Sequence, residues 1–173
     1  PYAEDRWARL PDANEAPLGL SVSILDALHT RWALLLTSMT EAEFQRAAFG
    51  DVRGERRFPW GDAGPDQRHG AFDFHTWDPT PAGSFPGGAS AWGVEDLVGN
   101  GWEWTSTTFA PFPGFTPIAS YPEYSADFFD GEHMVMKGAS PVTARELLRP
   151  SFRNWFRPRY PYVYATFRCV QSR

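Results

Sequence analysis

A segment near the C-terminus combines aromatic rings, arginines and one amide in a pattern that suits a small charged ligand. It runs Arg153-Asn154-Trp155-Phe156-Arg157-Pro158-Arg159-Tyr160-Pro161-Tyr162. Trp and Phe faces attract quaternary ammonium groups, and the amide of Asn154 can both donate and accept hydrogen bonds. The arginines of the segment can hold a carboxylate in a forked geometry. A second interpretation stays open, in which prolines bend a core segment and its arginines face solvent.

A second group of residues has the spacing of a hard-cation site. Asp96 and Glu103 supply carboxylates, and Gly99 and Gly101 between them let the backbone turn its carbonyl oxygens inward. Calcium takes six to eight oxygen ligands and tolerates irregular loops. The residues therefore allow two interpretations: a calcium site, or two carboxylates that accept hydrogen bonds from backbone N–H groups in the core.

The histidines and the single cysteine do not form a recognisable catalytic motif. His29, His69, His75 and His133 include no closely spaced pair, and we interpret them as surface or hydrogen-bonded residues. Cys169 lies in an apolar run, where a thiol is buried and inert. The chain has no G-x-S-x-G turn, and its glycine-rich stretch at Gly83–Gly88 lacks the lysine and helix of a phosphate loop.

Composition indicates one domain built on large rings and turns. The chain has 173 residues, of which 16% are aromatic, with 15 Gly and 16 Pro. Its net charge of −5 gives no electrostatic footprint for nucleic acid. One cysteine forms no internal disulfide and fits a reducing compartment. The apolar runs are too short for a membrane span, and we expect a cytoplasmic protein.

Periodicity and breaker residues predict few regular elements. Residues 1–20 are predicted to form an irregular arm, and residues 21–173 the domain. Leu25, Leu28, Trp32 and Leu35 recur at helical spacing. A second short helix is expected to begin at the N-cap Thr40, with a capping box, to bury Phe44 and Ala48, and to end at Gly50. Strands are predicted at Ala71–Phe74, Ala82–Phe85, His133–Lys137 and Val163–Val170.

Motifs along the chain resemble the formylglycine-generating-enzyme (sulfatase-modifying-factor) family. They are Thr40-Glu41-Ala42-Glu43-Phe44, Phe58-Pro59-Trp60-Gly61-Asp62, Gly99-Asn100-Gly101-Trp102-Glu103-Trp104-Thr105, Lys137-Gly138-Ala139-Ser140 and Thr166-Phe167-Arg168-Cys169. The resemblance implies an α+β, C-type-lectin-like fold, loop-rich with short strands and two short N-terminal helices. A calcium site of the family falls on Asp96, Gly99, Gly101 and Glu103.

Further segments resemble one branch, the C-terminal domain of the non-haem-iron sulfoxide synthases of ergothioneine or selenoneine biosynthesis. They are Phe112-Pro113-Gly114-Phe115, Tyr121-Pro122-Glu123-Tyr124-Ser125, Phe128-Phe129-Asp130-Gly131 and Arg153-Asn154-Trp155-Phe156. The resemblance implies an oxygen-dependent enzyme that uses Fe(II) to join a thiol or selenium donor to trimethylhistidine. It implies that Asn154, Trp155 and Phe156 contact this betaine, that Arg157 and Arg159 are candidates for its carboxylate, and that Tyr121 is a candidate catalytic tyrosine.

Two departures limit what the resemblance implies. The segment Pro141–Leu148 lacks the cysteine pair that holds copper in formylglycine generators, which excludes that activity. The chain also lacks the H-x-x-x-H-x-E iron motif, so a DinB-type iron-binding domain is expected upstream or in trans. Leu28-His29-Thr30-Arg31-Trp32 itself resembles a DinB-type helix, although we assign it to the one domain. A non-catalytic lectin-like module, with or without calcium, is the alternative function.

Overall fold

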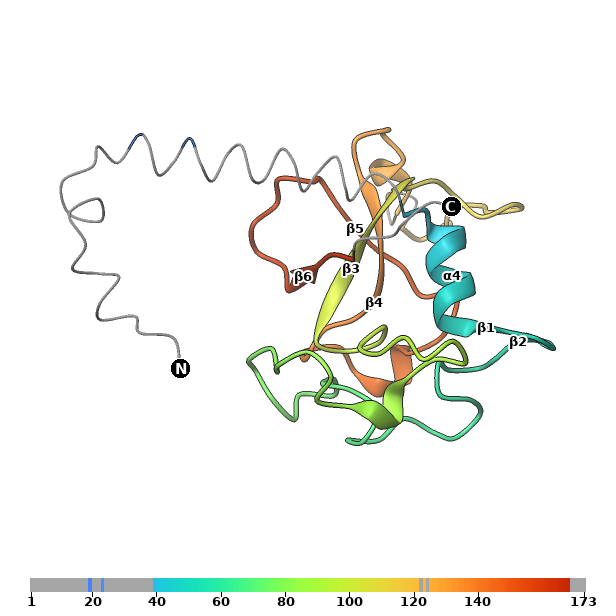
Figure 1. Ribbon diagram of the computed structural model, residues 1–173. Coiled ribbons are helices and arrows are strands. Elements are labelled where there is room, and N and C mark those ends of the chain that lie inside the picture. The colour runs from blue at the N-terminus through green and yellow to red at the C-terminus, as the bar shows by residue number, and fades with distance from the viewer. Residues whose placement is uncertain (1–18, 20–22, 24–38, 122, 124, 169–173) are drawn as a thin grey trace. The chain divides into compact units, whose positions relative to one another are not determined.

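The computed structural model describes Gly19, Ser23, residues 39–121, Glu123 and residues 125–168. The chain divides into two compact units, Pro1–Leu35 and Leu36–Arg173. In the first, Gly19 and Ser23 are helical, and the Ser23 hydroxyl donates to the Gly19 carbonyl (2.8 Å). The rest of the expected arm and of the helix expected after Ser21 lies outside the described residues. The second unit carries the fold described below (Figure 1).

Helix α4, Glu41–Phe49, begins and ends as its sequence predicts. Thr40 accepts from the Glu43 backbone N–H (3.2 Å), and the Thr40 N–H donates to the Glu43 carboxylate (2.6 Å), which completes the capping box. Phe44 and Ala48 are fully buried, as expected. Gly50 is required at the C-cap, because a β-carbon there would lie 2.6 Å from the Arg46 carbonyl oxygen.

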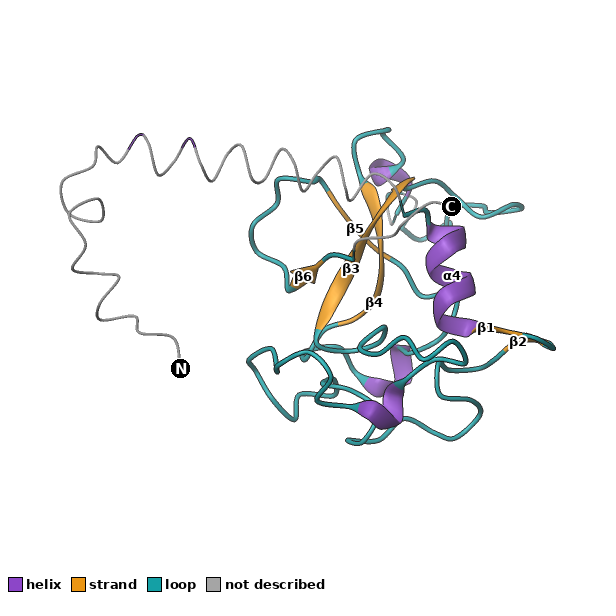
Figure 2. Cartoon of the chain, viewed as in Figure 1, coloured by secondary structure: helices purple, strands orange, loops and turns teal. Residues whose placement is uncertain are grey.

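A four-stranded sheet forms the centre of the unit, in the order β5-β4-β3-β6 (Figure 2). Its strands are β3 (Gly101–Thr108), β4 (Met134–Ala139), β5 (Asn154–Phe156) and β6 (Ala165–Thr166). β4 pairs antiparallel with β3 and β5, whereas β3 and β6 are parallel. The predicted strand at His133–Lys137 is confirmed as β4. The predicted strand at Val163–Val170 shortens to the two residues of β6 within the described part.

Loops occupy most of the remaining unit, interrupted by a two-stranded ribbon and three short helical turns. The ribbon pairs β1 (Gly50–Asp51) with β2 (Gly54–Glu55). The 3-10 turns are η1 (Pro86–Gly88), η2 (Ala126–Phe128) and η3 (Arg145–Leu147). This arrangement of small sheets and few helices matches the loop-rich α+β class expected from the sequence.

The predicted strands at Ala71–Phe74 and Ala82–Phe85 are wrong. Both segments are turns and bends. Asp73 and Phe74 have φ angles of 62° and 61°, and Gly83 has 79°, so the backbone enters the left-handed region and cannot run on as a strand. Tertiary hydrogen bonds hold the first turn: the N–H groups of Asp73 and Phe74 donate to the carbonyls of Thr143 and Pro141.

The hydrophobic core lies where α4 packs against β3 and β4. Its buried members come from the helix, from the loops before β3, and from β4 and the segment after it: Met39, Phe44, Ala48, Phe49, Phe58, Phe72, Leu97, Val98, Ala139 and Leu148. Because these loops contribute buried rings, they are held in place despite having little regular structure. The core fixes β3 and β4, and β4 in turn positions β5.

Candidate functional site

Strand β5 carries the Asn-Trp-Phe segment at one edge of the sheet. Its register places Asn154 opposite Met136, Trp155 opposite Val135 and Phe156 opposite Met134. All three β5 side chains are partly buried. Because successive side chains of a strand point to opposite faces, Asn154 and Phe156 share one face and Trp155 points to the other. The three predicted ligand contacts therefore cannot all line one side of the sheet.

On its face, Trp155 is packed among other rings. It stacks on Phe109 with 4.4 Å between ring centroids and an interplanar angle of 6°, and it lies 5.6 Å from Phe128. Phe109 also contacts Phe129 and the guanidinium of Arg153. One face of the indole thus stabilises the fold.

On the opposite face, Phe156 begins a row of rings. Tyr160 stacks on it at 4.5 Å and 11°, and Tyr162 meets Tyr160 edge-on at 5.6 Å. Tyr160 is exposed, and Tyr162 is 83% exposed. The Asn154 side-chain oxygen accepts from the Trp155 N–H at 3.0 Å, which leaves the amide NH₂ as a donor. This face therefore offers aromatic surface beside an amide donor, the combination expected from the sequence.

The two arginines after β5 lie in different surroundings. Arg157 makes ion pairs with Glu132 (3.0 Å) and Asp130 (3.5 Å). A ligand carboxylate would have to compete with these acidic partners for its guanidinium. Arg159 is exposed in the loop that follows. Tyr121 is also exposed, in a turn where its N–H donates to the Ile118 carbonyl.

A histidine–aspartate pair lies beside this strand, and the sequence analysis did not single it out. His133 Nδ1 lies 2.9 Å from Asp130 Oδ1, and Asp130 also accepts from the backbone N–H groups of Glu132 and His133. These hydrogen bonds, led by that of His133, lower the pKa of Asp130 well below its usual range. Phe128 meets the His133 ring edge-on at 5.3 Å and contacts Trp155.

The chemical consequence of this pair is a fixed imidazole. With Nδ1 held by the carboxylate, Nε2 is the position at which His133 can accept or donate a proton. The only sequence signal was the spacing of Asp130 and His133, which also occurs in ordinary turns.

The residues predicted to bind calcium meet at the start of β3. Glu103 is 2% exposed, and Arg168 Nε donates to its Oε1 at 2.8 Å. Burial raises the pKa of Glu103, with a smaller contribution in the same direction from Asp96, although Arg168 opposes the shift. Asp96 Oδ2 accepts from the Gly83 N–H at 2.7 Å. Buried Asp96 Oδ1 and Glu103 Oε2 have no hydrogen-bond partner among the described residues.

These two oxygens fit a hard cation, since buried carboxylate oxygens without a partner are costly. The glycines have packing reasons of their own. A β-carbon on Gly99 would lie 2.8 Å from the Ala71 carbonyl oxygen, and one on Gly101 would lie 2.5 Å from a Thr166 methyl. The Gly99 carbonyl already accepts from the Gly101 N–H at 2.8 Å. The carboxylates therefore support calcium binding more directly than the glycine carbonyls do.

Within the described ranges, no group of three or more His, Cys, Asp or Glu side chains could hold a metal ion. The same ranges contain no helix that is long and apolar enough to cross a bilayer. The described residues bring together, at β5, an aromatic face beside the Asn154 amide and an adjacent histidine–aspartate pair.

Comparison with known proteins identifies the family to which the chain belongs. The family model for the sulfatase-modifying factor enzyme 1-like domain matches residues 14–173. A hercynine oxygenase of Mycolicibacterium thermoresistibile is 42% identical over 135 residues, which cover 75% of this chain and 30% of that protein. Ergothioneine biosynthesis protein 1 of Neurospora crassa is 40% identical over 100 residues, covering 57% of this chain and 11% of that protein.

A solved structure supports the fold. PvdO from Pseudomonas aeruginosa superposes with a TM-score of 0.51 at 22% identity, covering 75% of this chain and 49% of that one. The chain spans less than a third of the length of the curated relatives named above. Their names therefore describe proteins with much additional chain.

Proposed function

Because the chain belongs to the sulfatase-modifying factor enzyme 1-like family, we propose that it is the substrate-binding part of an oxygen-dependent, non-haem-iron sulfoxide synthase. Such an enzyme would join a thiol or selenium donor to hercynine, which is trimethylhistidine, in ergothioneine or selenoneine biosynthesis. The relatives named hercynine oxygenase and ergothioneine biosynthesis protein 1 support this assignment. The lectin-like variant of the fold and a cytoplasmic location are part of the same proposal.

The observation that carries the proposal is the face of β5 with Asn154 and Phe156. A trimethylammonium group cannot donate hydrogen bonds, so aromatic faces and nearby acceptors are its main source of affinity. Phe156, Tyr160 and Tyr162 supply contiguous rings, partly exposed, at the edge of the sheet. The amide of Asn154 lies on the same strand face and can donate to the hercynine carboxylate or imidazole.

The remaining predicted residues take supporting roles in this proposal. Arg159 is available for the hercynine carboxylate, and Arg157 could exchange Glu132 for it. Trp155, stacked on Phe109, positions β5. His133, oriented by Asp130, can hold or pass a proton at Nε2 beside this strand. Tyr121 remains the proposed catalytic tyrosine.

The described residues do not form a site for the iron. None of the three described histidines, His69, His75 and His133, converges with two further His, Cys, Asp or Glu ligands in the described ranges. We therefore assign Fe(II) and its oxygen chemistry to a DinB-type domain, upstream in the same protein or acting in trans. This chain would hold hercynine, orient its imidazole and shield it from water.

Calorimetric titration of hercynine into the intact protein that carries this chain tests the proposal. We expect saturable binding. Phe156→Leu removes the aromatic face while keeping an apolar side chain, and should weaken binding about tenfold. Trp77→Leu is the matched control, because Trp77 is an exposed aromatic residue in the loop before β3 that contacts Phe74 and none of the β5 rings among the described residues. Absence of hercynine binding, or equal losses in the two variants, would contradict the proposal.

A second candidate function, a calcium-stabilised lectin-like binding module without catalysis, is favoured by the orphaned oxygens of Asp96 and Glu103. Its test is thermal unfolding with added calcium and after chelation. Calcium should raise the melting temperature of the wild type and leave Glu103→Gln unchanged. Equal melting temperatures with and without calcium would count against this candidate, and iron in the intact protein would favour the first.

A further inference from the structure

The structure contains a polar pocket of about 350 Å³, and none of the residues assigned above to hercynine or calcium lines it. It is lined by Pro65, Asp66, Gln67, Arg68, Phe72, Asp73, His75 and Arg145. Its volume is at the small end of the range for ligand sites, enough for a small metabolite. The lining comes from one loop before β3 and from η3, segments separated by more than sixty residues, so the tertiary fold creates it.

Two arginines in the pocket are held by aspartates. Arg68 binds Asp66 through both Nε (3.1 Å) and Nη2 (2.6 Å), and its side chain is 81% exposed. Arg145 Nη2 lies 2.6 Å from Asp73 Oδ2. Arg145 Nε also lies 3.8 Å from Glu146 Oε1. A guanidinium has five N–H donors in a fixed plane, so each arginine keeps donors that these carboxylates do not use, although a ligand oxyanion would share the guanidinium with them, as at Arg157.

Both aspartate carboxylates also accept hydrogen bonds from backbone N–H groups. The Arg68 N–H donates to Asp66 Oδ1 at 2.9 Å, and the Arg145 N–H donates to Asp73 Oδ1 at 3.2 Å. Hydrogen bonds from Arg68 are the main reason that the pKa of Asp66 lies well below its usual range. Every carboxylate oxygen of the pair therefore has a donor already, and the pocket offers few free acceptors.

Long-range backbone hydrogen bonds hold Asp73 in this position in a strained conformation. Asp73 and Phe74 both have φ near +60°, which costs about 1 kcal/mol or more for a residue with a β-carbon. Their N–H groups are bonded to the carbonyls of Thr143 (2.8 Å) and Pro141 (2.9 Å), in the segment that leads to Arg145. The strained turn and the arginine are thereby tied to each other before any ligand arrives.

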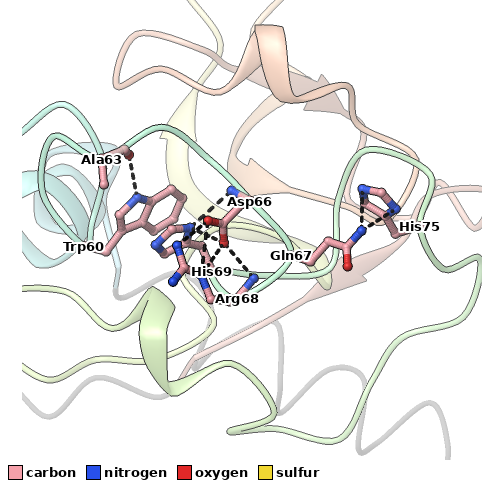
Figure 3. A network of polar contacts seen from close by, with 7 residues as sticks. All are labelled: Trp60, Ala63, Asp66, Gln67, Arg68, His69 and His75. Carbon is pink, nitrogen blue, oxygen red and sulfur yellow. Dashed lines mark hydrogen bonds and ion pairs between the residues drawn. The ribbon is translucent and has the colours of Figure 1, made fainter.

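Gln67 and His75 complete the donor set. Figure 3 shows the Gln67 side chain turned toward His75 and away from the Asp66 carboxylate. Gln67 Nε2 lies 3.3 Å from His75 Nδ1, which accepts in this contact and leaves Nε2, 3.7 Å from Asp73 Oδ2, as the donor of the exposed imidazole. On the other side, His69 stacks on Trp60 at 4.3 Å, which buttresses the turn that carries Asp66 and Arg68.

We propose that this pocket binds the oxyanion group of a small molecule, a carboxylate or a phosphate, between Arg68 and Arg145, with Gln67 and His75 as additional donors. The balance of donors over free acceptors carries the assignment. Planar guanidinium groups suit bidentate contacts with such oxygens. Arg68 and Arg145 are matched in formal charge by Asp66 and Asp73, so the assignment depends on the unused guanidinium donors and not on a net positive charge.

Titration with inorganic phosphate and with acetate, each at constant ionic strength set by chloride, tests the site. The readout is the NMR shift of the His75 ring protons, assigned with His75→Gln, together with calorimetry. Saturable binding of either probe supports the proposal. We expect Arg145→Gln to weaken it about tenfold. Arg53→Gln, which removes an exposed arginine from the β1–β2 ribbon turn, should bind as the wild type does.

A second variant keeps the test interpretable if Arg145→Gln disturbs the strained turn. Arg68→Gln removes an exposed side chain whose only side-chain partner in the described part of the protein is Asp66, and it should fold normally. It too should weaken binding. A linear, non-saturating response to both probes would overturn the proposal. So would equal affinities for Arg68→Gln, Arg145→Gln and Arg53→Gln.

Discussion

Strands β3 and β5 belong to one sheet, yet they differ in burial and in the use of their side chains. β3 is central, flanked by β4 and β6, and its residues from Gly101 to Glu103 are buried. β5 lies at the edge, and all three of its residues are partly buried. The most recognisable motif of the sequence lies on β3, whereas the residues that we propose to contact hercynine lie on β5.

This difference shows that an easily recognised sequence motif can reflect the requirements of core packing as much as those of function. On β3, Trp102 packs against Phe152 at 5.5 Å, and Gly101 leaves room for Thr166. The side chains of a buried central strand are closely packed, so few substitutions fit there without loss of stability. An edge strand has more freedom, so aromatic and amide side chains can serve a ligand there. Substitutions on the two strands should therefore affect different measurements.

The largest expected effect is on stability at the centre of the sheet. Trp102 is 5% exposed, so Trp102→Ala should lower the free energy of unfolding by about 3–5 kcal/mol. Phe156→Ala, at the partly buried edge, should lower the free energy of unfolding by about 1–2 kcal/mol, because the Phe156 side chain buries less apolar surface than that of Trp102. Denaturant unfolding of both variants measures the contrast. Equal losses would remove the distinction between the two strands.

A smaller contrast is expected between two cations. Lys137 on β4 is 1% exposed, and its Nζ donates to the carbonyls of Pro150 (2.6 Å) and Phe152 (3.0 Å) near Glu41. Burial lowers the pKa of Lys137.

Lys137→Met should cost about 2–4 kcal/mol, because buried acceptors and Glu41 lose their partner. Arg157→Met, which breaks exposed ion pairs beside β5, should change stability by less than about 1 kcal/mol. Urea titration of the two variants gives the comparison, and a large loss from Arg157→Met would show that the edge is structural as well.

The smallest effect concerns acid stability beside β5. The pKa of Asp130 is lowered in the folded protein, so its carboxylate contributes stability above the unfolded-state pKa of about 4 and loses that contribution as pH falls further. The melting temperature of the wild type should exceed that of Asp130→Asn at pH 6, and the gap should narrow below about pH 4. Asp127→Asn, an exposed neighbour, is the control. A gap that is independent of pH would refute the assigned cause.

Local interactions explain which elements could be predicted. The capping box of α4 joins residues three positions apart, and Phe44 and Ala48 follow from helical spacing. The strand at His133–Lys137 follows from alternation along a few residues. The turn at Asp73 and Phe74 was missed because left-handed angles are imposed by Thr143 and Pro141, about seventy positions away. No local pattern carries that information.

The candidate site divides in the same way. Its residue types at Asn154–Arg159 were visible in the sequence, whereas the split between the Phe156 face and the Trp155 face required the strand register. The position of the Asp130–His133 pair near β5 required the tertiary structure, in which Phe128 contacts both His133 and Trp155. The resemblance of the chain to its family, in contrast, could be recognised from the order and spacing of the sequence motifs. Those motifs encode local turns, helix caps and close backbone approaches, which depend on few neighbouring residues.

The sequence by itself thus determined the helix at Glu41–Phe49, the glycines that permit tight packing, and the chemistry available near the C-terminus. Only the tertiary structure decided which of those groups meet. It joined Glu103 to Arg168, Lys137 to Glu41, and Arg145 to Asp73. The physical reason is range: hydrogen bonds within one turn depend on a few neighbours, whereas these ion pairs depend on the packing of the whole sheet against α4 and its loops.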